Sequence, residues 1–277
     1  MTRAHETGLR RLLSASLTVA CLIAASAPAS ARILKTRRPG QPARGLALTL
    51  GSGFEYETDP EESEFGYPFL IEYELTKSLK LSAEPSYVQI RSKPGERGVS
   101  VSGSGDFETT LEYEFLPERR YRPALTAEGI VKWPTAAHEE IGTHEMDYSL
   151  GLVASKELVG FDLDFNALYT FVGSPPGLKL QNATEVSLAS EWHLRPALDL
   201  EAEVVTSTGG GIRGQSGTLG GIAGRAGSVG PSENVTEGTL GLAVHFNDFL
   251  KLEQGIVAKS DGSWQAVFAW EWEFGGR

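Results

Sequence analysis

Apolar and polar side chains alternate along several long stretches of the chain. The stretches from Phe107 to Phe115 and from Trp264 to Phe274 place mostly apolar residues at every second position, with carboxylates among the positions between. Successive side chains of a strand point to opposite faces, so each stretch predicts one apolar face and one acidic face. A strand that crosses a bilayer needs about 9–11 residues, roughly twice the usual length of a strand in a soluble protein. The pattern therefore predicts strands that stand between lipid and water.

Alternation and turn signals together predict twelve such strands. Their expected ranges are 45–58, 65–76, 79–91, 104–116, 121–133, 143–155, 160–172, 180–194, 197–209, 234–246, 249–259 and 263–275. Open strand edges would leave backbone groups without hydrogen bonds in hydrocarbon, so such strands must close into a barrel. The predicted fold class is all-β, a twelve-stranded antiparallel transmembrane β-barrel of the outer-membrane type.

Short and long connections alternate between these strands, as periplasmic turns and external loops do in outer-membrane barrels. Brief turns follow every second strand, which places both ends of the barrel on the periplasmic side. The longest connection runs from Gly210 to Glu233 and is rich in glycine. We expect an external loop there, and an inward fold that narrows the pore is the alternative.

A soluble β-sandwich or an eight-stranded ligand-binding barrel would also show alternation, with the apolar parity facing a core. Strands in those folds average about 5–6 residues, and their aromatic residues need not gather at strand ends. Here aromatic residues gather near the strand ends, as Trp270, Trp272 and Phe274 do. This distribution is typical of the aromatic girdles of a membrane barrel.

The first 31 residues have the pattern of a cleaved secretory signal peptide. Arg3, Arg10 and Arg11 precede an apolar stretch, and the segment ends in small residues that predict cleavage after Ala31. Cys21, the single cysteine, lies inside this segment, so the exported chain would have no thiol or disulfide. The expected location is the bacterial outer membrane, with lipid and small-molecule solutes as partners.

Residues 32–44 form a basic, proline-containing segment ahead of the barrel, which we place at 45–277. Its five basic residues would lie on the periplasmic side, and they are Arg32, Lys35, Arg37, Arg38 and Arg44. One hypothesis is that this tail plugs an acidic barrel mouth. The alternative is a mobile leader, because charged termini that contain proline are usually disordered.

The parity opposite the apolar one is rich in carboxylates. With the apolar parity facing lipid, the acidic residues predicted to line the lumen are Glu72, Glu74, Glu112, Glu114, Asp162, Asp164, Asp199, Glu201, Glu203, Glu253, Glu271 and Glu273. Strand direction puts them all in the periplasmic half, with Lys80, Arg122 and Lys251 as the expected inward cations. Crowded carboxylates attract cations, and the alternative is that they only keep the lumen hydrated. The formal charge of −11 argues against a nucleic-acid partner, because such proteins carry basic surfaces.

The sequence gives no arrangement typical of an enzyme or a cofactor site. Ser190 and His193 differ by three positions and so point to opposite faces of a strand, where they cannot pair. His138 and His144 lack the spacing of a helical zinc motif. We therefore predict no catalytic residues, no cofactor and no resident metal.

The run from Tyr73 to Tyr87, YELTKSLKLSAEPSY, resembles the strand-turn-strand of the "MetA-pathway of phenol degradation" family of outer-membrane proteins. The hairpin from Lys259 to Trp264 is also similar to that family. The resemblance implies an outer-membrane barrel that passes small or aromatic compounds. From the residues themselves we expect a diffusion channel with a lumen that favours cations. The alternatives are uptake of hydrophobic molecules, for which Leu70, Val88, Ile90, Ile130 and Val153 are the inward apolar candidates, and a structural barrel that conducts nothing.

Overall fold

The computed structural model describes residues 47–58, 62–93, 100–175, 180–208 and 234–275. The predicted signal peptide, the basic tail of residues 32–44 and the whole 210–233 loop lie outside these residues. In the described part of the chain, no helix is long and apolar enough to cross a membrane.

The described residues form fourteen strand segments in one sheet. Their bounds are β1 (Ala47–Thr58), β2 (Glu62–Thr76), β3 (Leu79–Glu84), β4 (Ser86–Ser92), β5 (Ser100–Ser104), β6 (Phe107–Leu116), β7 (Ala124–Trp133), β8 (Asp147–Leu158), β9 (Phe161–Phe171), β10 (Ala183–Arg195), β11 (Leu198–Thr208), β12 (Val235–Asn247), β13 (Leu250–Lys259) and β14 (Trp264–Gly275).

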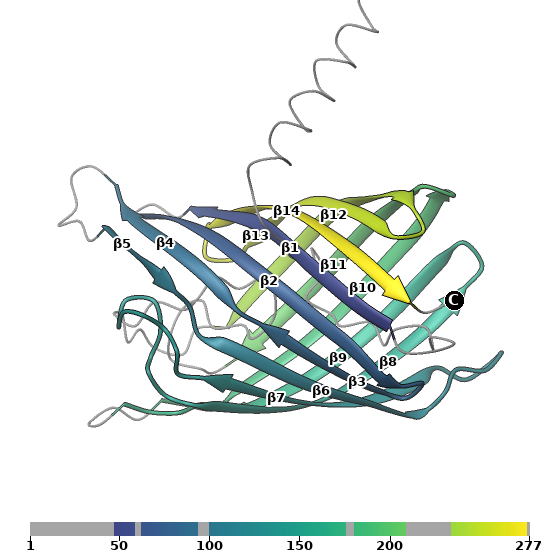
Figure 1. Ribbon diagram of the computed structural model, residues 1–277, viewed down its shortest axis with the longest axis horizontal. Helices are drawn as coiled ribbons and strands as arrows, with labels where there is room; N and C mark the ends of the chain where they lie inside the picture. Colours follow the sequence, from purple (N-terminus) through teal and green to yellow (C-terminus); the bar gives the residue numbers. More distant parts are fainter. Residues whose placement is uncertain (1–46, 59–61, 94–99, 176–179, 209–233, 276–277) are drawn as a thin grey trace, which may run out of the picture.

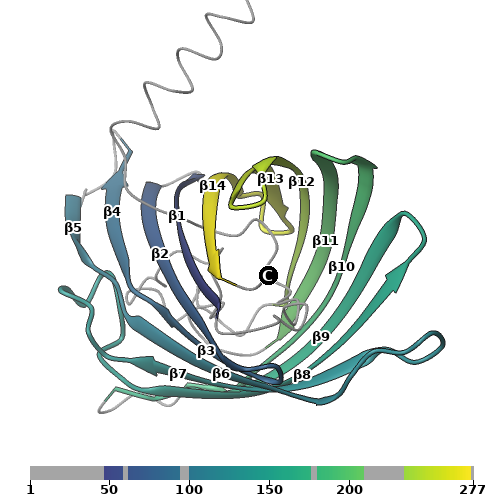
Figure 2. The ribbon, with the colours of Figure 1, turned by 45° about the vertical axis from the view of Figure 1, so that its right-hand side comes forward.

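The sheet closes on itself because β1 pairs antiparallel with β2 on one side and with β14 on the other. Figures 1 and 2 show β1 between these two neighbours in a continuous curved wall. Segments β3 and β4 form one span interrupted at Pro85, and both pair with β2. Segments β5 and β6 form the next span, so fourteen segments make twelve spans. The predicted twelve-stranded antiparallel barrel is confirmed.

The two strand interruptions lie side by side, and the backbone still pairs across them. Pro85 cannot donate a hydrogen bond, but its carbonyl accepts one from Phe69 N at 2.8 Å. Gly105 N, in the break between β5 and β6, donates to Ser86 O at 3.0 Å. The wall is therefore bent at this place without losing its closure.

Two ends of the barrel can be told apart by their connections. The short turns after β2, β6, β8, β10 and β12 lie at one end, here named the turn end. The described connections β7–β8 and β13–β14 lie at the opposite end, here named the loop end. The prediction that span six begins at residue 143 is wrong, since β8 begins at Asp147. Residues 134–146 instead form a connection that packs against β4 and β5.

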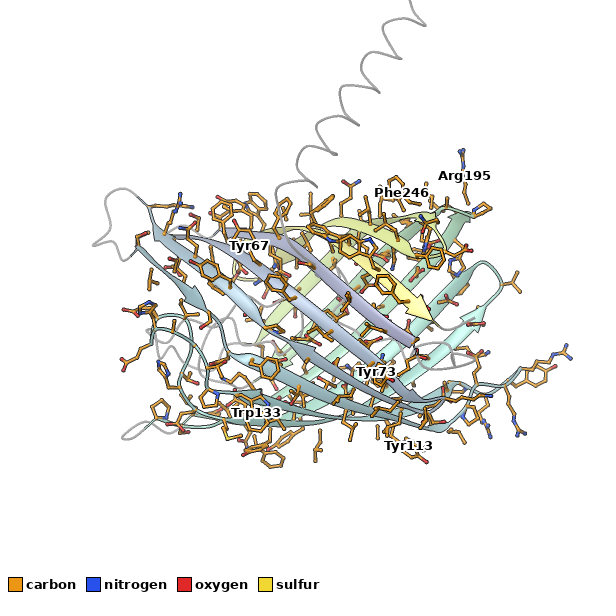
Figure 3. The ribbon with its side chains drawn as sticks, in the orientation of Figure 1. Tyr67, Tyr73, Tyr113, Trp133, Arg195 and Phe246 are labelled. Atoms are coloured by element: carbon orange, nitrogen blue, oxygen red, sulfur yellow. The ribbon has the colours of Figure 1, made fainter. Side chains whose placement is uncertain are left out.

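Aromatic side chains form two bands on the outer face. At the loop end the exposed members are Trp133, Tyr148, Tyr169, Phe171 and Trp264, and at the turn end they are Tyr113, Phe115, Trp192, Phe246, Trp272 and Phe274. Figure 3 shows Trp133 towards one end of the barrel and Tyr113 and Phe246 towards the other. Exposed leucines such as Leu111 and Leu150 lie between the bands. Such an apolar belt between aromatic girdles fits a hydrocarbon layer with water on both sides.

Candidate functional site: the barrel lumen

The inner parity of every span carries most of the buried polar residues. Among the acids predicted to line the lumen, those that are buried in the structure are Glu72, Glu112, Asp162, Asp164, Asp199, Glu201, Glu203 and Glu253. Glu74, Glu114 and Glu271 share this parity and are half-buried, while Glu273 is exposed at the turn end. All twelve residues lie on the same face of the barrel wall, opposite the aromatic bands.

One ion-pair group at the turn end is centred on Lys80. Its ammonium lies 3.3 Å from Glu72 Oε2 and 3.0 Å from Glu112 Oε2, which come from the spans on either side of β3. All three side chains are at most 8% exposed. A buried charge is tolerated only with such partners, so Lys80 and the two carboxylates depend on one another.

A second group at the turn end is centred on Lys251. Lys251 Nζ lies 3.2 Å from Glu201 Oε1 and 2.5 Å from Glu253 Oε1. Arg122, the other cation expected to face inward, instead lies in the β6–β7 turn and donates to Pro117 O. That expectation is wrong because the β7 strand begins at Ala124, so Arg122 precedes the span.

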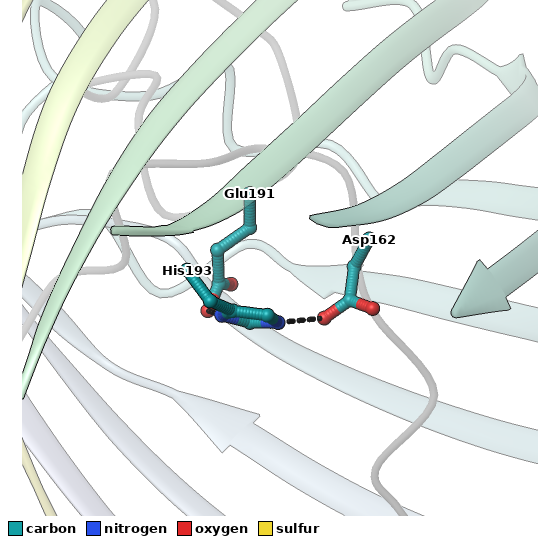
Figure 4. A group of neighbouring side chains, drawn as sticks. All are labelled: Asp162, Glu191 and His193. Atoms are coloured by element: carbon teal, nitrogen blue, oxygen red, sulfur yellow. Dashed lines mark hydrogen bonds and ion pairs between the residues drawn. The ribbon is translucent and has the colours of Figure 1, made fainter. Parts of the chain in front are cut away.

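Two histidines join the carboxylates of β9, β10 and β11 at the turn end. His193 Nε2 lies 3.0 Å from Asp162 Oδ2, as Figure 4 shows, and its Nδ1 lies 3.0 Å from Asp199 Oδ1. His245 Nε2, from β12, lies 2.6 Å from the other oxygen of Asp199. Glu191 completes the group, with Oε1 at 3.9 Å from His193 Nδ1. These five side chains, from four adjacent spans, are named the histidine cluster.

Carboxylates beyond these twelve also lie on the inner parity. The buried ones are Glu55, Glu84, Glu128, Asp147 and Glu237. The side chain of Glu128 lies over Gly151 of the neighbouring strand, where a Cβ would overlap it. Gln265 donates to Glu55 at 3.0 Å, and Lys259 contacts Glu57 at 2.7 Å. Carboxylates therefore lie on the inner parity near the loop end as well as the turn end. Glu55, Asp147 and Glu237 lie close to loops, where alternation fades.

The connection of residues 134–146, between β7 and β8, lies against the inner wall at the loop end. Ala137 N donates to Ser104 O at 2.9 Å, so the connection continues beside β5 as Figures 1 and 2 show. A Cβ at Gly103 would come 2.6 Å from Ala137 Cβ, so glycine permits this close approach. Ile141 is fully buried against Val88 and Ile90, which face inward. We name residues 134–146 the inner loop.

A buried group of charges fastens the inner loop. Lys132 Nζ lies 2.7 Å from Asp147 Oδ2 and 3.4 Å from Asp106 Oδ2, and it donates to Thr143 Oγ1 at 3.3 Å. Asp106 in turn accepts a hydrogen bond from Ala136 N at 3.0 Å. Lys132 and both carboxylates are at most 8% exposed. The loop is thus held at both its ends by one lysine.

Catalytic pairing is absent between the candidate groups. Ser190 and His193 lie on opposite parities of β10, with Ser190 paired to Ala202 on the outer face and His193 paired to Asp199 on the inner one. His138 and His144 are exposed in the inner loop.

No family model matches the sequence, and no curated protein matches it. Solved structures with the same fold do match. An outer membrane channel from Pseudomonas putida F1 superposes with a TM-score of 0.61 at 13% identity, over 86% of this chain and 100% of that one. The NanC porin gives a TM-score of 0.54 at 8% identity, over 82% and 99% of the two chains. The KdgM porin gives 0.53 at 7%, over 81% and 99%. The fold is that of outer-membrane barrels.

Proposed function

We propose that the chain forms a narrow diffusion channel for small solutes in the bacterial outer membrane, with a lumen that favours cations. The observation that carries this is the closed wall with opposite faces: an apolar, aromatic-banded outer face and an inner face lined by carboxylates. Structures named as a channel and as porins share the fold, which supports the same class of function.

The proposed path is lined by more negative than positive groups. At the turn end, Lys251 pairs with Glu201 and Glu253 and lies opposite Glu271 in the sheet, while Glu273 lies on the same face nearer the rim. Rings of carboxylates raise the local concentration of cations and repel anions. A barrel of twelve strands lies between filled eight-stranded barrels and the open channels of sixteen or more strands. Selectivity by wall charge is strongest in such a narrow lumen.

The test is single-channel conductance of the refolded chain from Arg32 onward in a planar bilayer, with a salt gradient across it. We expect a reversal potential on the cation-selective side that moves towards zero in the double variant Glu271→Gln and Glu273→Gln. A matched control is Glu139→Gln with Glu140→Gln, which removes two exposed carboxylates from the inner loop. A folded barrel without conductance would reject the channel.

A second candidate function is passage of small hydrophobic or aromatic molecules, which the resemblance to the MetA-pathway family also implies. Val88, Ile90 and Val101 on the inner wall form an apolar cluster with Ala136 and Ile141 of the inner loop. Leu70, Ile130 and Val153 are also buried on the inner parity. Val88, Ile90 and Ile141 are at most 4% exposed, so an apolar solute would reach this cluster only where the inner loop leaves the wall.

The two candidate functions separate in a permeation assay with a neutral aromatic solute. If the apolar cluster carries such molecules, uptake of benzyl alcohol into proteoliposomes should rise in Ile141→Ala, which loosens the contact of the inner loop with Val88 and Ile90. Val204→Asn, on the outer face, is the control for a general change of folding. Uptake equal to that of empty liposomes would exclude the second function and leave the first intact.

A further inference from the structure

We propose that the histidine cluster at the turn end binds a divalent transition-metal ion such as Zn²⁺. The inference goes beyond channel function and stands on the geometry of Asp162, Glu191 and His193, drawn in Figure 4. One ligand atom from each of these residues lies within 4.8 Å of the others. A second set with the same property consists of Glu191, Asp199 and His245, so Glu191 belongs to both.

The register of the barrel explains why these residues meet. Asp162 of β9 is the direct partner of Glu191 of β10, and His193 of β10 is the direct partner of Asp199 of β11. All of them stand on the inner parity, and residues opposite each other in a sheet have side chains about 5 Å apart. Strands of a closed barrel are fixed on both sides, so the donor atoms are held near one another before an ion arrives.

The chemistry of the donors selects the class of ion. Imidazole with carboxylate is a ligand set suited to Zn²⁺, Cu²⁺ and Ni²⁺, whereas Mg²⁺ and Ca²⁺ prefer oxygen donors alone. Ligands at about 2.0–2.2 Å from a zinc ion lie roughly 3–3.5 Å apart. The distance of 3.0 Å from His193 Nε2 to Asp162 Oδ2 is already in that range. Glu191, with its longer side chain, has to move inward to complete the set.

Asp199 supplies the support that a metal-bound histidine requires. With Nε2 of His193 on the ion, Nδ1 donates to Asp199 Oδ1 at 3.0 Å, which fixes the orientation of the ring. Metal-bound histidines almost always donate their other N–H group to a carboxylate or carbonyl in this way. The second oxygen of Asp199 lies 2.6 Å from His245 Nε2, so the carboxylate is itself held. Asp199 is a positioning residue in this arrangement.

A buried carboxylate oxygen beside the cluster is a second, independent observation. Glu201 is the lumen-facing partner of Glu191, is only 1% exposed, and has one carboxylate oxygen, Oε2, that is buried without a hydrogen-bond partner among the described residues. Its other oxygen, Oε1, accepts a hydrogen bond from Lys251 Nζ at 3.2 Å. A dication close to Glu191 would place positive charge beside this buried carboxylate. His193 and His245 are 43% and 39% exposed, which leaves the donors accessible from the barrel mouth.

Direct binding tests the proposal without relying on channel function. The refolded chain from Arg32 onward, purified without a histidine tag, is titrated with ZnCl₂ by isothermal calorimetry, and with MgCl₂ in parallel. We expect saturable binding of one Zn²⁺ per chain and no comparable binding of Mg²⁺. His193→Ala should weaken Zn²⁺ binding at least tenfold, and Asp199→Asn should weaken it by about 10–100-fold as a positioning residue.

The control is His138→Ala, which removes an exposed histidine at the loop end and should leave the affinity unchanged. If His193→Ala does not fold, as judged by the absence of the heat-dependent mobility shift of a folded barrel in gel electrophoresis, Glu191→Gln replaces it as the cluster variant. Equal affinity in the wild-type chain and in both cluster variants would overturn the proposal, as would the absence of saturable Zn²⁺ binding. The conductance experiment above decides channel function separately when EDTA is added to it, because the barrel is then measured without bound metal.

Discussion

The two ends of the lumen use the same kinds of side chain for different purposes. At the loop end, Lys132 is 8% exposed and fastens the inner loop through Asp106 and Asp147. At the turn end, Lys251 is 22% exposed and stands among carboxylates with no loop over it in the described residues. The buried Lys132 therefore stabilises the position of the inner loop. The more exposed Lys251 instead contributes to the electrostatic potential in the lumen. The comparison teaches that a lumen charge can be assigned a role only after its burial and partners are known.

The largest effect is expected for Lys132→Met. Removal of one partner from a buried ion pair leaves uncompensated charge, here on Asp106 and Asp147, at a cost of about 3–5 kcal/mol. The free energy of unfolding in urea, measured in lipid vesicles, should fall by that order. Lys132→Arg should keep most of the stability because it keeps the charge, and Lys77→Met, an exposed lysine in a turn, is the control. A loss below about 0.5 kcal/mol, the scale of surface substitutions, would show that Lys132 does not fasten the loop.

The next effect is expected for Ile141→Ala in the inner loop. Truncation of a fully buried aliphatic side chain costs about 2–5 kcal/mol in soluble cores. The inner loop is not one of the paired strands of the wall, so we expect the loss to appear locally. We expect faster proteolysis within residues 134–146 and a larger single-channel conductance. Val159→Ala, in an exposed turn, is the matched control, and an unchanged proteolysis rate would argue against docking of the loop.

The sequence predicts the barrel wall well, because parity is a local property. The faces of the spans, the even number of strands and the positions of the short turns all follow from alternation and turn residues. The predicted strand bounds are wrong where a residue makes a contact with another part of the chain. Thr143 was assigned to a strand, but it lies in the inner loop and accepts a hydrogen bond from Lys132. Pro85 and Gly105 divide two spans in a way that alternation does not register.

The lumen residues could be assigned to a face from the sequence, but their partners could not. Alternation places His193 and Asp199 on the inner parity of their strands, yet only the register brings His193 between Asp162 and Asp199. Periodicity does not predict the inner loop. Ile141 is buried only because it packs against Val88 and Ile90, which lie about fifty positions earlier in the chain. A signal existed in Gly103, a small residue on an inward position, but glycine alone does not say what approaches it.

A smaller effect on stability, but a clear one on selectivity, is expected for Lys251→Met. The variant removes one positive charge from the turn end while Glu201 and Glu253 remain, so the reversal potential should become more cation-selective. Stability should fall less than in Lys132→Met, since water screens the more exposed lysine. Lys156→Met is the matched control, because Lys156 is also 22% exposed at the turn end but lies on the outer parity and pairs with Glu118. An equal shift of the reversal potential in both variants would mean that the lumen face has no special influence.

The smallest effect is expected for Glu273→Gln, and salt distinguishes it from Glu271→Gln. Glu273 is exposed at the rim, whereas Glu271 lies one inward position deeper and is half-buried beside Lys251. The Debye length is about 10 Å at 0.1 M salt and about 3 Å at 1 M, so exposed charges lose their influence first. The reversal potential, measured at a fixed salt ratio and at both mean concentrations, should therefore shift in Glu273→Gln only at low salt and in Glu271→Gln at both. If the two variants respond to salt alike, then the deeper position of Glu271 does not protect its carboxylate from screening. Water and salt would then reach Glu271 as freely as they reach Glu273 at the rim.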